Sequence, residues 1–321
     1  MKPMEKQERL ERLQRLREAL LRELPALELR EAEPLAKYTS FRIGGPAALL
    51  ALPASEQQLR EILQLARKIG VRPVILGAGT NVLAPDAGLE TLLIRTKENL
   101  TGLRLTEGGR ISAECGVTLA ALANFAREQG LTGLEFAHGI PGTVGGGIMM
   151  NAGAYGGELA QVTARTVYMH PDGSVEIFEG ARQGFGYRRS AFAQLDGIIL
   201  RAEFALQPGD PAEIRRIMED LAARRRASQP LEFPSAGSTF RRPAGGYAAR
   251  LIDGAGLKGL QVGGAAVSEK HAGFVINRGG ASCADVLALM AQIQKAVEAC
   301  SGILLEPEVR LLSLPPDGDP A

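Results

Sequence analysis

Glycines crowd the segment between residues 133 and 158, where they stand at positions 133, 139, 142, 145, 146, 147, 153, 156 and 157. Glycine costs backbone entropy and weakens both helices and strands, so regular structure alone does not require this many. It is required where the chain turns at positive φ or where another molecule approaches bare main chain. Main-chain N–H groups freed in this way, followed by a helix N-terminus, form a cradle for a pyrophosphate. The structural alternative is a loop that merely packs tightly.

A second glycine turn lies upstream, where Gly77-Ala-Gly-Thr-Asn81 follows a predicted buried strand over residues 71–76. It begins like the dinucleotide fingerprint GxGxxG but has Val82 in place of the third glycine. No helix is expected to open here, because Pro85 and Gly88 continue the loop. No GxxxxGK[ST] phosphate loop occurs in the chain. Two separate glycine loops predict one elongated phosphate-bearing cofactor held from two sides, outside a conventional dinucleotide fold.

The motifs and their order resemble those of the UDP-N-acetylenolpyruvoylglucosamine reductases. The segments that carry the resemblance are Gly77-Ala-Gly-Thr-Asn81, Gly139-Ile-Pro-Gly-Thr-Val-Gly-Gly146, Asn151-Ala-Gly-Ala-Tyr155, Tyr187-Arg-Arg-Ser190, Ala236-Gly-Ser-Thr-Phe240 and Leu305-Glu-Pro-Glu-Val-Arg310. They span the chain from about Tyr38 to Arg310. The resemblance implies an α+β protein with a p-cresol-methylhydroxylase-type FAD-binding domain of two α+β subdomains, followed by a smaller α+β substrate-binding domain.

The chain is therefore expected to divide into four parts. These are an N-terminal amphipathic helix extension over 1–28, the FAD-binding domain over 29–206, the C-terminal substrate-binding domain over 207–313 and a flexible tail over 314–321. Helices are predicted over residues 5–24, 55–70, 118–129, 210–226, 247–252 and 282–299, from leucine stripes, capping residues and terminal glycines. Hairpins are predicted at residues 107–109 and 171–173, a strand at 274–277 and closing strands over 303–312.

The resemblance implies FAD and NADPH as cofactors. In that family NADPH reduces the flavin, whose N5 then passes hydride to the vinyl carbon of an enolpyruvyl ether on UDP-N-acetylglucosamine, which gives UDP-N-acetylmuramate for peptidoglycan synthesis. The sequence does not decide between NADPH and NADH. The cofactor-binding residues that the resemblance implies are Arg42, Gly77, Gly79, Thr80, Asn81, Gly139, Ile140, Pro141, Gly142, Thr143, Gly145, Gly146, Asn151 and Gly153.

The same resemblance implies three catalytic residues, because hydride transfer leaves an enolate that needs positive charge and a proton. Arg188 corresponds to the arginine of the family's Tyr-Arg-x-Ser motif, and its guanidinium suits a carboxylate that gains charge. Ser238 corresponds to the proton donor. Its hydroxyl is a poor acid, but against a basic enolate position matters more. Without the motif, a surface salt bridge for Arg188 and a turn position for Ser238 are the simpler interpretations.

Glu308 corresponds to the family's second motif glutamate, beside the developing enolate. A carboxylate fits there only if it is protonated or bridged by a donor, so we predict a pKa raised by burial and by a like-charged neighbour. Glu306 is the alternative, since Pro307 places the two on different faces of an extended segment. An exposed charge on an edge strand is the structural alternative for either.

Substrate contacts follow less directly from the sequence. The candidates are Tyr187, Arg242, Lys270 and His271, of which the basic residues suit a diphosphate. Between Phe240 and Gly254 there is no room for a long insertion, so the chain resembles the family's shorter type, which lacks the tyrosine-bearing lid loop. The sequence does not identify the residue that replaces this tyrosine or the residues that contact uracil.

Composition sets the remaining limits. The 37 basic and 36 acidic residues balance, so no nucleic-acid or membrane partner is expected. The 3 cysteines are scattered and no spacing suggests a metal site. A cytoplasmic protein is expected, since neither a signal peptide nor a membrane-spanning run is found. A monomer is expected, although the N-terminal helix could form a dimer contact. The rivals are an FAD oxidase of a sugar or hydroxy acid on the same fold, and a non-enzymatic nucleotide-binding protein.

Overall fold

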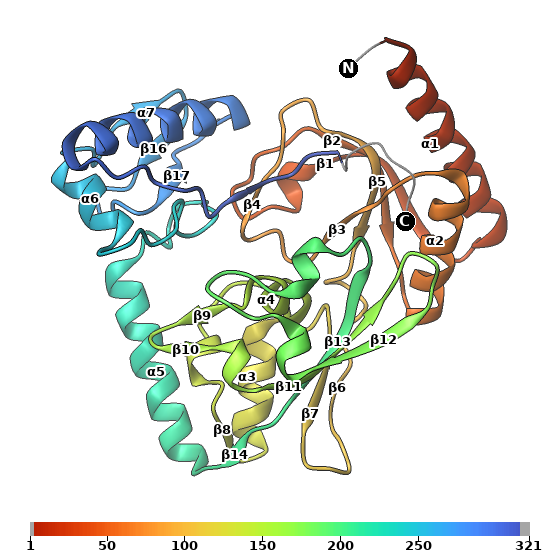
Figure 1. Cartoon of the computed structure of the whole chain (residues 1–321), viewed down its shortest axis with the longest axis horizontal. Helices are drawn as coiled ribbons and strands as arrows, with labels where there is room; N and C mark the ends of the chain where they lie inside the picture. The colour runs from red at the N-terminus through yellow and green to blue at the C-terminus, as the bar shows by residue number, and fades with distance from the viewer. Residues whose placement is uncertain (1–2, 315–321) are drawn as a thin grey trace.

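The computed structural model describes residues 3–314, and Figure 1 shows them as three packed units. Two units are built on separate sheets, and the third carries helices α6 and α7 at one end of the molecule. Helices and strands mix throughout, as the α+β prediction requires. Except for its first residue, the predicted tail over 314–321 lies outside the described residues. The boundaries of the four predicted parts stay a prediction.

The first unit is a four-stranded sheet covered on one face by two helices. Residues alternate between its faces, so Leu49 and Ala51 join the core under the helices while Leu50 packs into the core of the opposite face. Leu16 and Leu20 of the N-terminal helix are fully buried in the helix-covered core, which confirms the centre of the predicted leucine stripe, whereas Leu10 at its start is 40% exposed. The strands, in sheet order, are β1 (Glu28–Pro34), β2 (Pro46–Leu52), β5 (Leu89–Arg95) and β3 (Val74–Leu76), and the helices are α1 (Pro3–Glu23) and α2 (Glu56–Ile69).

The second unit is a five-stranded antiparallel sheet packed against α3 (Leu119–Glu128) and α4 (Val144–Met150). Both predicted hairpins are present in it, with Gly109 and Gly173 at positive φ in their turns. The strands, in sheet order, are β12 (Val175–Glu179), β11 (Thr163–Met169), β13 (Ile198–Phe204), β7 (Ile111–Glu114) and β6 (Leu103–Leu105). Two short pairs flank the sheet: β9 (Gly153–Ala154) with β10 (Gly157–Glu158), and β14 (Gln207–Pro208) with β8 (Leu131–Thr132).

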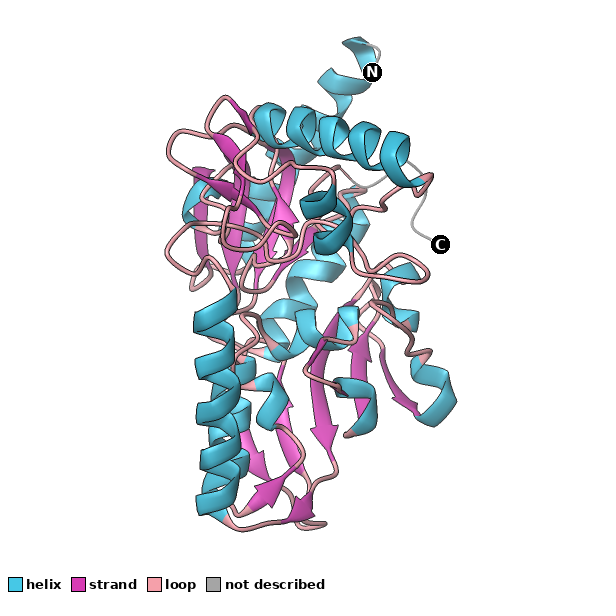
Figure 2. Ribbon diagram, turned by 90° about the vertical axis from the view of Figure 1, so that its left-hand side faces the viewer, coloured by secondary structure: helices cyan, strands magenta, loops and turns pink. Residues whose placement is uncertain are grey.

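Helix α5 (Pro211–Ser228) leads from the second unit to the third. Asp210 caps it by accepting a hydrogen bond from the N–H of Ala212, as the sequence predicts. Figure 2 shows the helix standing along the second unit and ending beneath the third. The third unit packs α6 (Ala248–Gly254) and α7 (Cys283–Ser301) on a sheet of β15 (Gln261–Val262), β16 (Ala265–Val267) and β17 (Val275–Asn277).

The end of the chain returns from the third unit to the first. Strand β18 (Arg310–Leu311) pairs in parallel with β4 (Val82–Leu83), which directly follows the upstream glycine turn. The closing strands predicted over 303–312 are therefore mostly wrong: Pro307 lacks an N–H and makes only an isolated bridge to Phe240. The strand predicted over 71–76 is likewise shorter, because only β3 finds a partner in the sheet. This return places the Glu308 segment beside the glycine turn.

Candidate active site

The two glycine loops lie against each other. Thr80 Oγ1 donates to the carbonyl oxygen of Pro141 at 2.9 Å. A Cβ on Gly77 would collide with Thr143 Oγ1, and a Cβ on Gly79, which has φ +67°, would collide with the carbonyl oxygen of Tyr38. Gly77 is therefore needed for the approach of the two loops, and Gly79 for the approach of the upstream loop to Tyr38. Both predicted cofactor segments meet at one place.

One polar atom at this junction has no partner. Thr143 Oγ1 is buried and makes no hydrogen bond within the described chain. Gly142 stands at φ +152°, and a Cβ on exposed Gly146 would contact only Thr143 Oγ1, at 3.7 Å. An orphaned buried hydroxyl beside bare main chain fits a polar ligand, because buried polar groups are normally hydrogen-bonded. The loop residues therefore fit a bound FAD.

The start of α4 contributes less than the sequence suggested. The helix does begin directly after the loop, at Val144. However, the N–H groups of Val144 and Gly145 donate to the carbonyl oxygens of Val117 and Cys115, so they are not available to a phosphate. Ile140 also faces the protein, since it packs against the core of the second unit.

The side chains of Asn81 and Asn151 are bound to protein. Asn81 Nδ2 donates to the carbonyl oxygen of Glu308 at 3.2 Å, and the Asn81 carbonyl oxygen accepts from the N–H of Arg310 at 3.1 Å. Asn151 is buried and donates to the carbonyl oxygen of Gly186 at 3.1 Å, just before the Tyr187 motif. Each asparagine therefore fixes the backbone beside a predicted catalytic residue. Their roles as cofactor ligands stay predictions.

Arg42 is exposed and adopts φ +55°, a left-handed conformation that is uncommon for residues other than glycine. The N–H of nearby Ser40 donates to the carbonyl oxygen of Gly79 at 2.9 Å. This bond holds the loop that carries Arg42 against the upstream glycine turn. The contact places Arg42 near the upstream glycine turn, and its role in cofactor binding stays a prediction.

Arg188 and Glu308 form an ion pair between distant parts of the chain. Arg188 Nε donates to Glu308 Oε1 at 2.8 Å, and Nη2 donates to the carbonyl oxygen of Gly153 at 3.0 Å. The two side chains are only 24% and 13% exposed. Arg188 itself adopts φ +54°, a strained conformation of the kind that clusters at functional sites. Segments from all three units therefore converge here.

Burial raises the pKa of Glu308, while Arg188 and Arg241 act in the opposite direction. The predicted direction and its desolvation cause agree with the structure, but the predicted like-charged neighbour is wrong. The neighbouring charge belongs to Arg188, which the chain brings in from a separate unit. The alternative, Glu306, has a side chain 72% exposed and pairs with Arg241 at 3.3 Å. Glu308 is thus the carboxylate that faces the site.

Ser238 lies beside this pair. The N–H of Glu308 donates to the carbonyl oxygen of Thr239 at 2.8 Å, and the N–H of Thr239 donates to the carbonyl oxygen of Gly273 at 2.8 Å. Within the part of the chain that the structure describes, the exposed Ser238 hydroxyl makes no hydrogen bond. Its backbone is therefore fixed by Thr239 while its hydroxyl is available to a ligand.

Two of the predicted substrate residues extend this arrangement. Tyr187 is 53% exposed, its ring lies 5.3 Å from Arg188 Cζ, and its Oη accepts from the N–H of Arg242 at 3.2 Å. Arg242 Cζ in turn lies 4.3 Å from the ring centre of Tyr247, which is 54% exposed. No sequence motif marks Tyr247, so it is not among the predicted site residues. A tyrosine–arginine–tyrosine row thus continues outward from Arg188.

Lys270 and His271 make their contacts elsewhere. Lys270 Nζ donates to the carbonyl oxygen of Arg226 at the end of α5, at 2.7 Å. His271 Nδ1 accepts from the N–H of Gly273 at 3.1 Å, and burial lowers the pKa of the ring. Neither side chain hydrogen-bonds to Arg188 or Glu308 among the described residues. The structure places them at the junction of α5 with the third unit.

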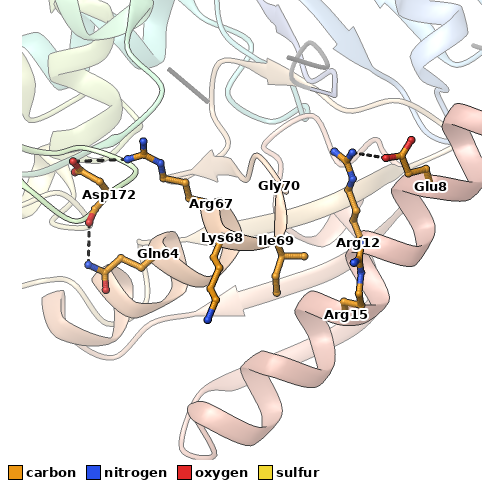
Figure 3. Close-up of a pocket in the computed structure, with 9 residues that line it drawn as sticks. All are labelled: Glu8, Arg12, Arg15, Gln64, Arg67, Lys68, Ile69, Gly70 and Asp172. Atoms are coloured by element: carbon orange, nitrogen blue, oxygen red, sulfur yellow. Dashed lines mark hydrogen bonds and ion pairs between the residues drawn. The ribbon is translucent and has the colours of Figure 1, made fainter. Parts of the chain in front are cut away.

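A separate pocket of about 700 Å³ lies between α1, α2 and the β11–β12 turn (Figure 3). Its lining is formed by Glu8, Arg12, Arg15, Gln64, Arg67, Lys68, Ile69, Gly70 and Asp172. None of these belongs to the predicted site. Arg67 and Lys68 lie in the last turn of α2, where cations interact favourably with the helix dipole.

Within residues 3–314, none of the helices is long and apolar enough to span a bilayer.

Comparisons with known proteins match both halves of the chain. A family model described as an FAD binding domain matches residues 47–178, and one described as the C-terminal domain of UDP-N-acetylenolpyruvoylglucosamine reductase matches residues 229–312. A reductase of that name from Clostridioides difficile is 43% identical over 91% of this chain and 96% of its own length. Another, from Caldanaerobacter subterraneus, is 45% identical over 87% of this chain and 92% of its own.

A solved structure agrees with these relatives. The crystal structure of UDP-N-acetylenolpyruvylglucosamine reductase from Thermus caldophilus superposes with a TM-score of 0.78 at 33% identity, covering 89% of this chain and all of that one. The resemblance and the fold inferred from the sequence motifs, an FAD-binding domain followed by a smaller α+β domain, are thereby confirmed. The chain belongs to the UDP-N-acetylenolpyruvoylglucosamine reductase family and is an FAD-dependent oxidoreductase.

Proposed function

We propose that this chain reduces UDP-N-acetylenolpyruvoylglucosamine to UDP-N-acetylmuramate with NADPH as the reductant. The observation that carries the proposal is the convergence of Arg188, Glu308 and Ser238 beside the two glycine loops. When bound, FAD supplies the two-electron chemistry that passes reducing equivalents from NADPH to the enolpyruvyl group. The protein contributes binding, orientation and protons. NADPH, the enolpyruvyl ether and one proton give NADP⁺ and the lactyl ether, so the reaction balances.

Arg188 is placed to bind the carboxylate of the enolpyruvyl group. Its Nε and Nη2 are held by Glu308 and the Gly153 carbonyl oxygen, which fixes the plane of the guanidinium. Among residues 3–314 the remaining donors on Nη1 and Nη2 have no hydrogen-bond partner, so they can bind a carboxylate. As the β-carbon gains hydrogen, negative charge grows on this carboxylate as an enolate, and a fixed guanidinium stabilises it more than it stabilises the ground state.

Glu308 holds Arg188 and can carry a proton. Because burial raises its pKa, the neutral acid is more accessible to Glu308 than to an exposed glutamate. In the neutral form it donates a hydrogen bond to the enolate; in the ionised form it orients Arg188. Both roles place the carboxyl next to the developing charge.

Ser238 is the proposed donor of the proton to the α-carbon. The next residue, Thr239, makes backbone hydrogen bonds to Gly273 and Glu308. These bonds fix the backbone of Ser238, so its hydroxyl is held beside the Arg188–Glu308 pair. The hydroxyl is a weak acid, but proton transfer to a basic enolate depends chiefly on position. An oxidase on this fold would need a base instead, and neither His138 nor His271 hydrogen-bonds to these three residues within the described chain.

The Ser238→Ala variant tests the proposal in two half-reactions. NADPH should still reduce bound FAD within a few-fold of the wild-type rate, since no proton to the substrate is needed. Oxidation of the reduced enzyme by the enolpyruvyl nucleotide should slow by about 10²–10⁴-fold, the usual contribution of a positioned acid. Exposed Ser301→Ala is the control, with both rates unchanged. An unaltered second half-reaction in Ser238→Ala would remove the serine from the mechanism, and wild-type enzyme that fails to turn over this nucleotide would refute the function.

A further inference from the structure

Arg225, near the end of α5, is a half-buried arginine without a partner. Within residues 3–314 its guanidinium makes no hydrogen bond, ion pair or ring contact. A Cβ on Gly139 would lie 3.4 Å from Arg225 Cδ and 3.7 Å from Nη1, so the side chain lies along the start of the downstream glycine loop. Its neighbour Arg224 differs: it is 66% exposed and pairs with Asp220 at 2.9 Å. In the sequence, both arginines are cations near a helix C-terminus and look equivalent. The structure shows that their burial and their partners differ.

A half-buried guanidinium without an acceptor is unusual. Burial lowers the pKa of Arg225, yet arginine remains protonated at any physiological pH. Its N–H donors are therefore partly removed from water and have no acceptor on the described chain. This desolvation costs free energy unless a bound group accepts hydrogen bonds from them. An anion that binds at this place would remove the cost.

The surroundings of Arg225 also select for an anion. Lys270 contacts the carbonyl oxygen of the next residue, Arg226, so a second cation stands at the same helix end. No described carboxylate is among the groups that act on the pKa of Arg225, and the one side chain that does is the Tyr155 phenol. Tyr155 is 48% exposed at φ +54°. His138 Nδ1, beside Gly139, is also buried without a partner.

We propose that Arg225 binds a diphosphate at the Gly139 end of the downstream glycine loop. A planar guanidinium with parallel donors matches two phosphate oxygens, and bare main chain at Gly139 permits close approach. Two ligands of this enzyme carry a diphosphate: FAD, and the UDP part of the substrate under the proposed function. Arg225 stands between the loop expected to hold the first and Lys270, expected to contact the second. The interpretation that Arg225 binds the diphosphate of UDP rests on the proposed function. The interpretation that it binds the diphosphate of FAD does not.

The test is equilibrium binding by Arg225→Gln, with Arg224→Gln as the matched control. FAD is titrated into the deflavinated full-length enzyme and followed by quenching of flavin fluorescence. UDP and uridine are titrated separately into the FAD-loaded enzyme by calorimetry. We expect at least a tenfold rise in the Kd of one diphosphate ligand in Arg225→Gln and less than a twofold change in Arg224→Gln. Thermal melts report whether each variant is folded.

The separate titrations of FAD, UDP and uridine show which of the two diphosphates Arg225 binds. Weaker FAD binding with UDP binding unchanged assigns Arg225 to the cofactor diphosphate. Weaker UDP binding with FAD and uridine binding unchanged assigns it to the nucleotide substrate. FAD and UDP affinities both within twofold of wild type in folded Arg225→Gln would overturn the proposal. Should the glutamine variant not fold, Arg225→Lys decides by the same titrations, since it keeps the charge and loses the fork. These titrations do not depend on turnover, so failure of the proposed function would show separately as an inactive wild type.

Discussion

Two arginine-rich regions of the molecule differ in how their charges are held. In the pocket between α1 and α2, Arg12 pairs with Glu8 one helical turn away, and the two side chains are 41% and 61% exposed. In the candidate active site, Arg188 pairs with Glu308 across 120 residues, and both are mostly buried. The first pair forms within one helix, and water and salt screen the attraction between its charges. The second pair forms only because three units of the fold meet.

The comparison shows which property separates the proposed catalytic pair from the charges of the pocket. The pocket has more charges than the Arg188–Glu308 pair, so their number does not distinguish the two. Burial does. Of these two regions, as far as the structure describes them, only the candidate active site has a carboxyl whose pKa is raised by desolvation and a guanidinium within hydrogen-bond distance of it. Such a carboxyl can change protonation state during a reaction, whereas an exposed, locally paired acid stays ionised near neutral pH.

Among the variants that test this comparison, the largest effect is expected from Glu308→Gln, which removes the titrating group and keeps the shape. We expect reduction of the enolpyruvyl nucleotide to slow by about 10²-fold or more, as for loss of a positioned acid. In the wild type, this rate should also fall as pH rises through the raised pKa of Glu308, because the neutral acid is lost. Stopped-flow rates across pH should show that alkaline limb vanishing in Glu308→Gln.

The same substitution has a pH-dependent effect on stability. A carboxyl whose folded-state pKa is raised binds its proton more tightly in the folded state, so the favourable contribution is present at low pH and is lost as pH rises through the folded pKa. The difference in melting temperature, Glu308→Gln minus wild type, should therefore increase between the ordinary glutamate pKa and neutral pH. A difference that is constant over that range would contradict the raised pKa. Glu306→Gln is the exposed control and should show neither effect.

A smaller effect is expected from Asn81→Ala, which tests how Glu308 is positioned. Loss of the bond from Asn81 Nδ2 to the Glu308 carbonyl oxygen removes about 1 kcal/mol and frees the segment to shift. We expect kcat to fall about tenfold at saturating FAD, since small misplacements at a reacting centre are costly. Thr80→Val, which breaks the contact between the two glycine loops, is the comparison and should weaken FAD binding rather than kcat. Normal kcat with weaker FAD binding in Asn81→Ala would instead make the asparagine a cofactor ligand.

Local signals in the sequence predicted the helices well. Ser55, Asp210 and Ser282 all act as N-caps in the structure, since a cap depends on residues three or fewer positions away. The short strands were harder, because β3 and β18 exist only through partners elsewhere in the chain. When two paired strands are far apart in the sequence, no local sequence pattern reveals their pairing.

The site was predicted in the same uneven way. Motifs singled out Arg188, Ser238 and Glu308 as candidates, and the structure brings them together, but spacing could not reveal that the neighbour of Glu308 is a guanidinium. Arg225 and Arg224 look equivalent in a run of three arginines, and only the packing of α5 on the loop at Gly139 distinguishes them. Residue types can be read locally, whereas burial and partners follow from the assembled fold.

The smallest effect is expected in the pocket of Figure 3, where Arg12→Ala and Arg67→Ala remove one partner from exposed pairs. Arg12 pairs at i,i+4 spacing, and Arg67 stands 3.8 Å from Asp172. Exposed pairs of this kind contribute about 0–1 kcal/mol, less at high salt, so each variant should unfold within about 1 kcal/mol of wild type in urea and keep its kcat. A tenfold loss of kcat in a folded variant would mean that this pocket communicates with the active site, and the contrast between the two arginine regions would then rest on more than burial.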